Sequence, residues 1–195
     1  MNPLPSPGTA PSSRPERSAQ AGVRVRAATR GDLERVAEVA AHYVRETCVT
    51  FEEEPWDVPA WERKLDDVAA RGLPFLVAEV DAADGTSPAG TALAGYAYAS
   101  PWRPKPAYRH TVEDTIYLDP RHAGRGVGTA LLRALLDACA SVGVRQVVSV
   151  VADVPEAAGS VPLHRRFGFT EAGRLTAVGF KHGRWVDTIL LQRTL

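Results

Sequence analysis

Cysteine is scarce in this chain: only Cys48 and Cys139 occur among 195 residues. They lie far apart in sequence and lack the paired spacing of zinc ligands, so the sequence predicts neither a disulfide framework nor a metal site. Both are expected to be small buried hydrophobic residues rather than nucleophiles. This cysteine usage suits a reducing compartment, and we expect a cytoplasmic protein.

An excess of either charge sign is also lacking, because 23 Lys and Arg residues balance 23 Asp and Glu residues. Without a basic excess, the chain has no electrostatic footprint for nucleic acid or an anionic membrane. No apolar stretch reaches transmembrane length, and residues 1–21, rich in Pro and Ser, contain no signal-peptide hydrophobic region. We expect 1–21 to be a disordered tail and 22–195 a single domain without nucleic-acid or membrane partners.

Hydrophobic periodicity predicts strands and helices that alternate along this domain. The expected strands are 23–27, 74–80, 92–100, 111–118, 146–151, 171–179 and 185–193, with turns at 81–90 and 180–184. A capping box at 29–32 opens the first helix, a second helix begins at 57–59, and a short helix covers 157–167. The helix between the strands at 111–118 and 146–151 carries an expected core stripe of Leu131, Leu132, Leu135, Ala138, Cys139 and Val142.

Three glycines at alternate positions follow the central strand: Gly124, Gly126 and Gly128. Successive backbone N–H groups and the start of the next helix can converge there on phosphate oxygens. No Lys-Ser or Lys-Thr follows, which excludes a nucleotide P-loop, and the glycine spacing disfavours a dinucleotide fold. A pyrophosphate loop of another kind and a simple tight corner both stay open on the loop alone.

The segments around this loop resemble the acetyl-CoA site of the GNAT acetyltransferases. A strand ending in Tyr-Leu-Asp-Pro leads into Ala-Gly-Arg-Gly-Val-Gly at 123–128, which matches the family glycines and departs at Ala123, where Gln or Arg is usual. Thr-Val-Glu at 111–113, Leu-His at 163–164 and Gly-Phe-Lys-His-Gly-Arg-Trp at 179–185, with Asp187, resemble the phosphinothricin acetyltransferase branch. The resemblance covers 23–195 and implies an α/β (α+β) GNAT fold, a mixed central sheet flanked by helices on both faces.

The resemblance also implies a site for acetyl-CoA as co-substrate, with no metal. The residues it assigns to acetyl-CoA are Tyr117, Leu118, Arg125, Gly126, Val127, Gly128, Thr129 and Ser160. Acetyl transfer requires a deprotonated amine, a polarised carbonyl and a protonated leaving thiol. Glu113 is the candidate base, and backbone N–H groups near Tyr117 and Leu118 are candidates to polarise the carbonyl. His164 either protonates the departing sulfur or packs against acetyl-CoA.

The implied acceptor is the α-amine of a small anionic amino-acid-like compound such as phosphinothricin, methionine sulfone or methionine sulfoximine. Its candidate ligands are Phe51, Arg103, Lys105, Tyr108 and Lys181. The branch commonly has Arg at position 105, Asn near Ala157 and Glu at position 165. Two alternatives stay open: acetylation of a protein N-terminus or another amine, and a non-catalytic acyl-CoA-binding protein. The resemblance further implies a homodimer with Trp102 and Trp185 near the shared edge.

Overall fold

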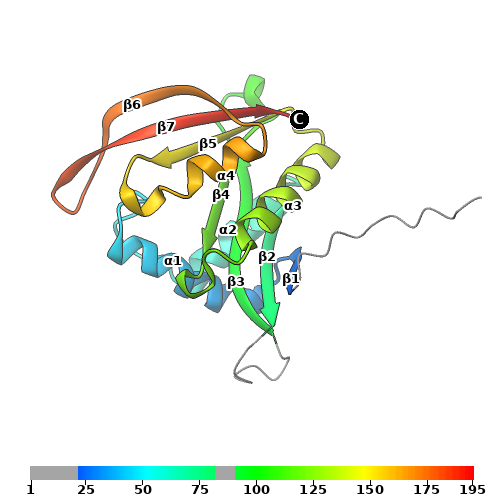
Figure 1. Cartoon of the computed structure of the whole chain (residues 1–195). Helices are drawn as coiled ribbons and strands as arrows, with labels where there is room; N and C mark the ends of the chain where they lie inside the picture. The colour runs from blue at the N-terminus through cyan, green and yellow to red at the C-terminus, as the bar shows by residue number, and fades with distance from the viewer. Residues whose placement is uncertain (1–21, 82–90) are drawn as a thin grey trace, which may run out of the picture.

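The computed structural model describes residues 22–81 and 91–195 of the chain. The tail expected at 1–21 and nearly all of the turn expected at 81–90 lie outside these residues. Within them, the strands form one mixed sheet in the order β1-β2-β3-β4-β5-β7-β6, in which only β4 and β5 run parallel (Figure 1). The strands are β1 Val23–Ala27, β2 Phe75–Asp81, β3 Thr91–Pro101, β4 Thr111–Leu118, β5 Gln146–Ala152, β6 Thr170–Lys181 and β7 Arg184–Thr194. The mixed sheet confirms the predicted fold class.

Helices cover both faces of this sheet (Figure 1). The helices are α1 Leu33–Glu46, α2 Val58–Ala70, α3 Val127–Ser141 and α4 Ser160–Arg166. Side chains of a strand alternate between its faces, so Val77 of β2 packs in the core beneath α1 and α2, whereas Ala78 packs in the core beneath α3. None of the described helices is long and apolar enough to cross a membrane.

The predicted capping box is confirmed at the start of the first helical segment. The carboxylate of Asp32 accepts hydrogen bonds from the Thr29 N–H at 2.7 Å and the Thr29 hydroxyl at 2.8 Å. Arg26 of β1 also donates to Asp32, at 2.8 and 2.7 Å. Asp57 caps α2 in a similar way by accepting from the Ala60 N–H at 2.8 Å. These local bonds satisfy donors that would otherwise lack partners where each helix begins.

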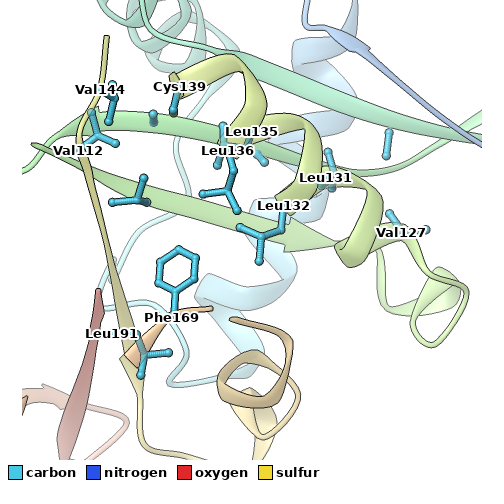
Figure 2. Packing of buried hydrophobic residues seen from close by; sticks show 14 of the residues in the cluster. Val112, Val127, Leu131, Leu132, Leu135, Leu136, Cys139, Val144, Phe169 and Leu191 are labelled. Carbon is cyan, nitrogen blue, oxygen red and sulfur yellow. The ribbon is translucent and has the colours of Figure 1, made fainter. Parts of the chain in front are cut away.

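The apolar face of α3 forms the centre of the larger core, as Figure 2 shows. Leu131, Leu132, Leu135 and Cys139 are fully buried against the sheet, as predicted. The prediction was wrong for Val142, which is 52% exposed because it is the C-cap residue, beyond the last turn that faces the sheet. Each leucine buried in this way contributes roughly 1.5–3 kcal/mol by removing apolar surface from water.

The last two strands form a ribbon that extends beyond the body of the sheet (Figure 1). Its turn is shorter than predicted: β6 ends at Lys181 and β7 begins at Arg184, so only His182 and Gly183 connect them. Both have positive φ angles, 49° and 75°, as a two-residue hairpin turn matched to the strand twist requires. Four large apolar side chains of this ribbon are exposed: Leu175, Val178, Phe180 and Trp185.

The pairing of β4 with β5 is short and stops near the middle of both strands. It joins Thr111–Glu113 to Gln146–Val148, and Glu113 lies opposite Val148 as the last pair. Beyond that pair, β4 continues alongside β3 and β5 continues alongside β7, so each strand keeps a partner on its other edge. The sheet therefore opens between β4 and β5 at Asp114 and Ser149.

Candidate active site

The opening between β4 and β5 leads into a cleft of about 730 Å³, the large cleft. Its walls are the second halves of both strands, the glycine-containing loop, the start of α3 and one side of α4. Residues of both strands beyond the last β4–β5 pair, including Leu118 and Ala152, line it. The large cleft thus occupies the position that a further β4–β5 ladder would have filled.

The glycine loop gives one end of the large cleft an anion-binding geometry. Gly126 is the N-cap of α3 and adopts a left-handed conformation with a φ of 81°. Val127, Gly128 and Thr129, the first residues of α3, line the cleft with N–H groups that have no partner inside the helix. A Cβ at Gly128 would lie 3.2 Å from the side chain of Leu163, so glycine lets α3 pack closely against α4. A helix start with backbone donors at a cleft favours phosphate oxygens.

A second cleft of about 230 Å³, the small cleft, lies on the α1 and α2 side. Aromatic side chains dominate its lining: Phe51, Trp56, Trp61, Tyr96, Tyr98 and Tyr117. The two clefts share lining residues of β4 and β5, among them Glu113, Thr115 and Val150. Glu113 is therefore a carboxylate at the junction of a large cleft with backbone donors and a small aromatic cleft.

Charged neighbours act on the Glu113 carboxylate in opposite directions. Burial raises the pKa of Glu113, and the adjacent Asp114 carboxylate raises it further. The positive charges of Lys64 and Arg103 oppose this increase. Lys64 of α2 is held near the site because its ammonium donates to the Ser100 hydroxyl at 2.8 Å and lies 4.6 Å from the centre of the Tyr98 ring. The pKa of Glu113 is thus shifted upward, in the direction that favours a general base.

His164 of α4 lies at the point where β4 and β5 separate, and both of its ring nitrogens contact protein groups. Nδ1 lies 2.8 Å from the Ser160 carbonyl oxygen and can only donate to it. Nε2 lies 2.9 Å from Oδ2 of Asp114 and 3.1 Å from the Ser149 hydroxyl. Burial would lower the pKa of His164, but Asp114 and the Ser160 carbonyl raise it above its usual value. A doubly protonated ring paired with the Asp114 carboxylate satisfies these contacts.

Comparison with known proteins decides the family. The model of the acetyltransferase (GNAT) family matches residues 37–169 of the chain. The chain belongs to the GNAT family. The phosphinothricin N-acetyltransferase of Alcaligenes faecalis is 40% identical to this GNAT protein over 98% of the chain and 95% of that relative. The methionine sulfoximine and methionine sulfone acetyltransferase of Pseudomonas aeruginosa is 33% identical over 88% of the chain and 94% of that relative.

A solved structure extends this comparison to three dimensions. The phosphinothricin acetyltransferase of Sinorhizobium meliloti, solved in complex with acetyl-CoA, superposes on this GNAT protein with a TM-score of 0.79. It is 37% identical in sequence, and the alignment covers 89% of each chain. The predicted family resemblance and the predicted fold are therefore confirmed.

The structure of this GNAT protein brings most of the predicted site residues together. The large cleft is lined by Glu113, Tyr117, Leu118, Gly126, Val127, Gly128, Thr129, Ser160 and His164. Arg125 is exposed and does not line it. Phe51 lines the small cleft, whereas Arg103, Lys105 and Tyr108 are exposed and line neither cleft. Lys181 is buried, and its ammonium donates to the Thr50 carbonyl oxygen at 2.9 Å.

Sequence reasoning missed the side chains that reach the site from other elements. Lys64 and Trp61 belong to α2, whose amphipathic pattern predicts only core packing. Asp114 and Ser149 each occupy a strand, and only the contact of both with His164 distinguishes them. Asp114 did have one sequence signal, because an acidic residue directly follows the candidate base in a strand that is otherwise apolar or neutral.

The Asp114–His164 pair predicts a pH-dependent stability. Because the folded pKa of His164 exceeds its unfolded value, the stabilisation is fully present below about pH 6.5 and is lost as pH rises through the folded pKa. Asp114→Asn should flatten this decline, because an amide provides no charge that favours the imidazolium. Urea unfolding from about pH 6 to about pH 9 measures the slope, with the exposed Asp137→Asn as control. Equal slopes in all three proteins would contradict the pairing.

Proposed function

We propose that this protein transfers the acetyl group of acetyl-CoA to the α-amine of a small amino-acid-like acceptor, such as phosphinothricin, methionine sulfone or methionine sulfoximine. The observation that carries the proposal is the junction of two unequal clefts at Glu113. The relatives named phosphinothricin and methionine sulfoximine/sulfone acetyltransferases support this acceptor class. An aromatic cleft of about 230 Å³ suits an amino acid better than a folded protein surface.

The residues of the large cleft fit acetyl-CoA. The N–H groups of Val127, Gly128 and Thr129 at the start of α3 would hold the pyrophosphate, and the left-handed Gly126 lets the backbone approach it. Bound acetyl-CoA supplies the acetyl group as a thioester. Main-chain groups near Tyr117 and Leu118 would orient its carbonyl, because they lie beyond the last β4–β5 pair.

Glu113 would remove the proton from the acceptor ammonium, directly or through a water molecule. Its position on β4 is fixed by pairing with Ser100 of β3 on one side and Val148 of β5 on the other. The rigid strand holds the carboxylate where both clefts meet, and this positioning of two substrates itself contributes to the rate. His164 has both ring nitrogens bound to protein groups, so we assign it to holding the site rather than to base catalysis.

The predicted acceptor ligands divide into three groups in this proposal. Phe51 would contact the acceptor directly as a wall of the small cleft. Lys181 would act through the loop it holds, because its ammonium binds the Thr50 carbonyl. Arg103, Lys105 and Tyr108 would act from the exposed loop before β4, where the charge of Arg103 already reaches Glu113. An anionic acceptor would be drawn by charge toward Arg103 and Lys105.

A panel of acceptors tests the proposed function. Thiol release from acetyl-CoA should occur with phosphinothricin, methionine sulfone or methionine sulfoximine and should exceed that with ordinary amino acids and peptides. Turnover only with peptide N-termini would favour protein acetylation instead. Binding of acetyl-CoA by calorimetry without turnover on any amine would favour a non-catalytic acyl-CoA-binding protein.

The base assignment predicts a specific kinetic defect. Glu113→Gln should lower kcat on the order of a hundredfold or more, because an α-amine of pKa roughly 8 is mostly protonated at neutral pH. Acetyl-CoA affinity should stay nearly unchanged, since the glycine loop is untouched. In the parent, kcat/KM should rise with pH through the raised pKa of Glu113, because only the deprotonated carboxylate accepts a proton.

Two variants accompany this measurement. His164→Ala should reduce kcat less than Glu113→Gln does, and Glu34→Gln, an exposed glutamate on α1, should leave turnover unchanged. If Glu113→Gln were near normal from about pH 6 to about pH 9 while His164→Ala lost activity, the base would be His164.

We also propose that the protein works as a homodimer in the cytoplasm. The exposed apolar residues Leu175, Val178, Phe180 and Trp185 of the β6–β7 ribbon offer a surface for a second copy, and Trp102 is expected near the same edge. The buried free cysteines Cys48 and Cys139 suit a reducing compartment. Sedimentation at micromolar concentration should give a dimer in the parent and a weaker dimer after Trp185→Ser. A parent that sediments as a monomer would exclude this assembly and leave the chemistry unaffected.

A further inference from the structure

The tip of the Phe51 ring lies directly against the backbone of Gly179 on β6. A Cβ atom added at Gly179 would lie 2.3 Å from Cζ of Phe51, and 2.4 and 2.6 Å from its two Cε atoms. Real Cβ contacts below 3.0 Å are essentially never observed, so any other residue at 179 would force the ring to move. The φ angle of Gly179 lies outside the left-handed region, so the need for glycine there is steric rather than conformational.

Lys181 holds the same loop from two residues further along β6. Side chains at alternate positions of a strand share a face, and Gly179 and Lys181 are both buried whereas Phe180 between them is 54% exposed. The Lys181 ammonium donates to the carbonyl oxygen of Thr50, the residue before Phe51. This face of β6 therefore fixes both the backbone and the ring of the segment that carries Phe51.

An irregularity in β6 places these residues. Between the pairs Leu175–Thr188 and Gly179–Val186, three residues of β6 face only one residue of β7, Asp187. Ala177, inside this bulge, has a positive φ of 51°, and its N–H donates to the Asp187 carboxylate at 2.8 Å. Such bulges change the direction in which the following side chains point. The bulge thus precedes and orients the face on which Phe51 rests.

We infer that Gly179 is a positioning residue for the acceptor: by leaving room for the Phe51 ring, it sets the place of one wall of the small cleft. The inference rests on the proposed function insofar as the small cleft receives the acceptor amine. The glycine itself touches no substrate. Its effect on catalysis passes through Phe51, so Gly179 determines which acceptors fit without altering the residues that bind acetyl-CoA.

Gly179→Ala tests this inference against a matched control on the same strand. Gly173 also lies on β6 and has an ordinary φ, but an added Cβ would meet nothing within 4 Å. Gly179→Ala should change kcat/KM for the preferred acceptor roughly tenfold, the size of effect expected when a pocket wall shifts by about a methylene group. The change should appear mainly in the acceptor KM, with acetyl-CoA affinity as in the parent. Gly173→Ala should match the parent.

A double variant shows whether the effect passes through Phe51. In Phe51→Leu the ring tip is absent, so adding Gly179→Ala should change kcat/KM little further. An undiminished effect of Gly179→Ala in the Phe51→Leu protein would overturn the inference. So would equal behaviour of Gly179→Ala and Gly173→Ala.

A readout independent of turnover separates this inference from the proposed function. In protein labelled with ¹³C-phenylalanine, the aromatic resonance of Phe51 is identified by its loss in Phe51→Leu. That resonance should shift in Gly179→Ala and stay in place in Gly173→Ala. A shifted resonance in a protein that acetylates none of the panel amines would uphold the contact and reject the proposed function. An unshifted resonance would overturn the inference whatever the activity.

Discussion

The early end of the β4–β5 ladder is the feature on which the site depends. Parallel strands normally continue their hydrogen bonds along their shared length, yet these stop at Glu113 and Val148. Each strand can separate because an antiparallel neighbour, β3 or β7, still satisfies its other edge. The opening provides a cleft whose walls are rigid strands, and it leaves Glu113 on the last residue pair before the gap.

His164 stabilises the place where β4 and β5 separate, because its side chain contacts both strands where their backbone pairing ends. Its Nε2 approaches Asp114, the first residue of β4 beyond the pairing, and Ser149, the first residue of β5 beyond it. One buried imidazole thereby links both strands from α4. Removing either partner would leave a buried polar group without compensation, which is costly in a low-dielectric interior. We therefore view the Asp114–His164 pair as part of the framework that fixes the width of the opening between β4 and β5.

Much of this fold follows from local patterns in the sequence. The Thr29–Asp32 capping box and the leucine stripe of α3 were predictable because neighbouring residues determine them. Val142 was mispredicted because periodicity does not reveal where a helix turns away from the sheet. The roles of Lys64 and Gly179 could not be predicted, since each depends on a residue far away in the chain: Ser100 for Lys64 and Phe51 for Gly179.

Apart from the lining residues that the two clefts share, mainly on β4 and β5, each cleft is shaped by a different part of the chain, and this has a consequence for how the protein can change over evolutionary time. The loop after α1, helix α2 and the end of β6 shape the small cleft or its wall, whereas the glycine loop, α3 and α4 shape the large one. Substitutions at Phe51 or Gly179 can accumulate without disturbing Gly126 or Thr129. On the proposed assignment of the small cleft to the amine and the large cleft to acetyl-CoA, a lineage that carries this architecture can exchange one amine for another while its acyl donor stays constant.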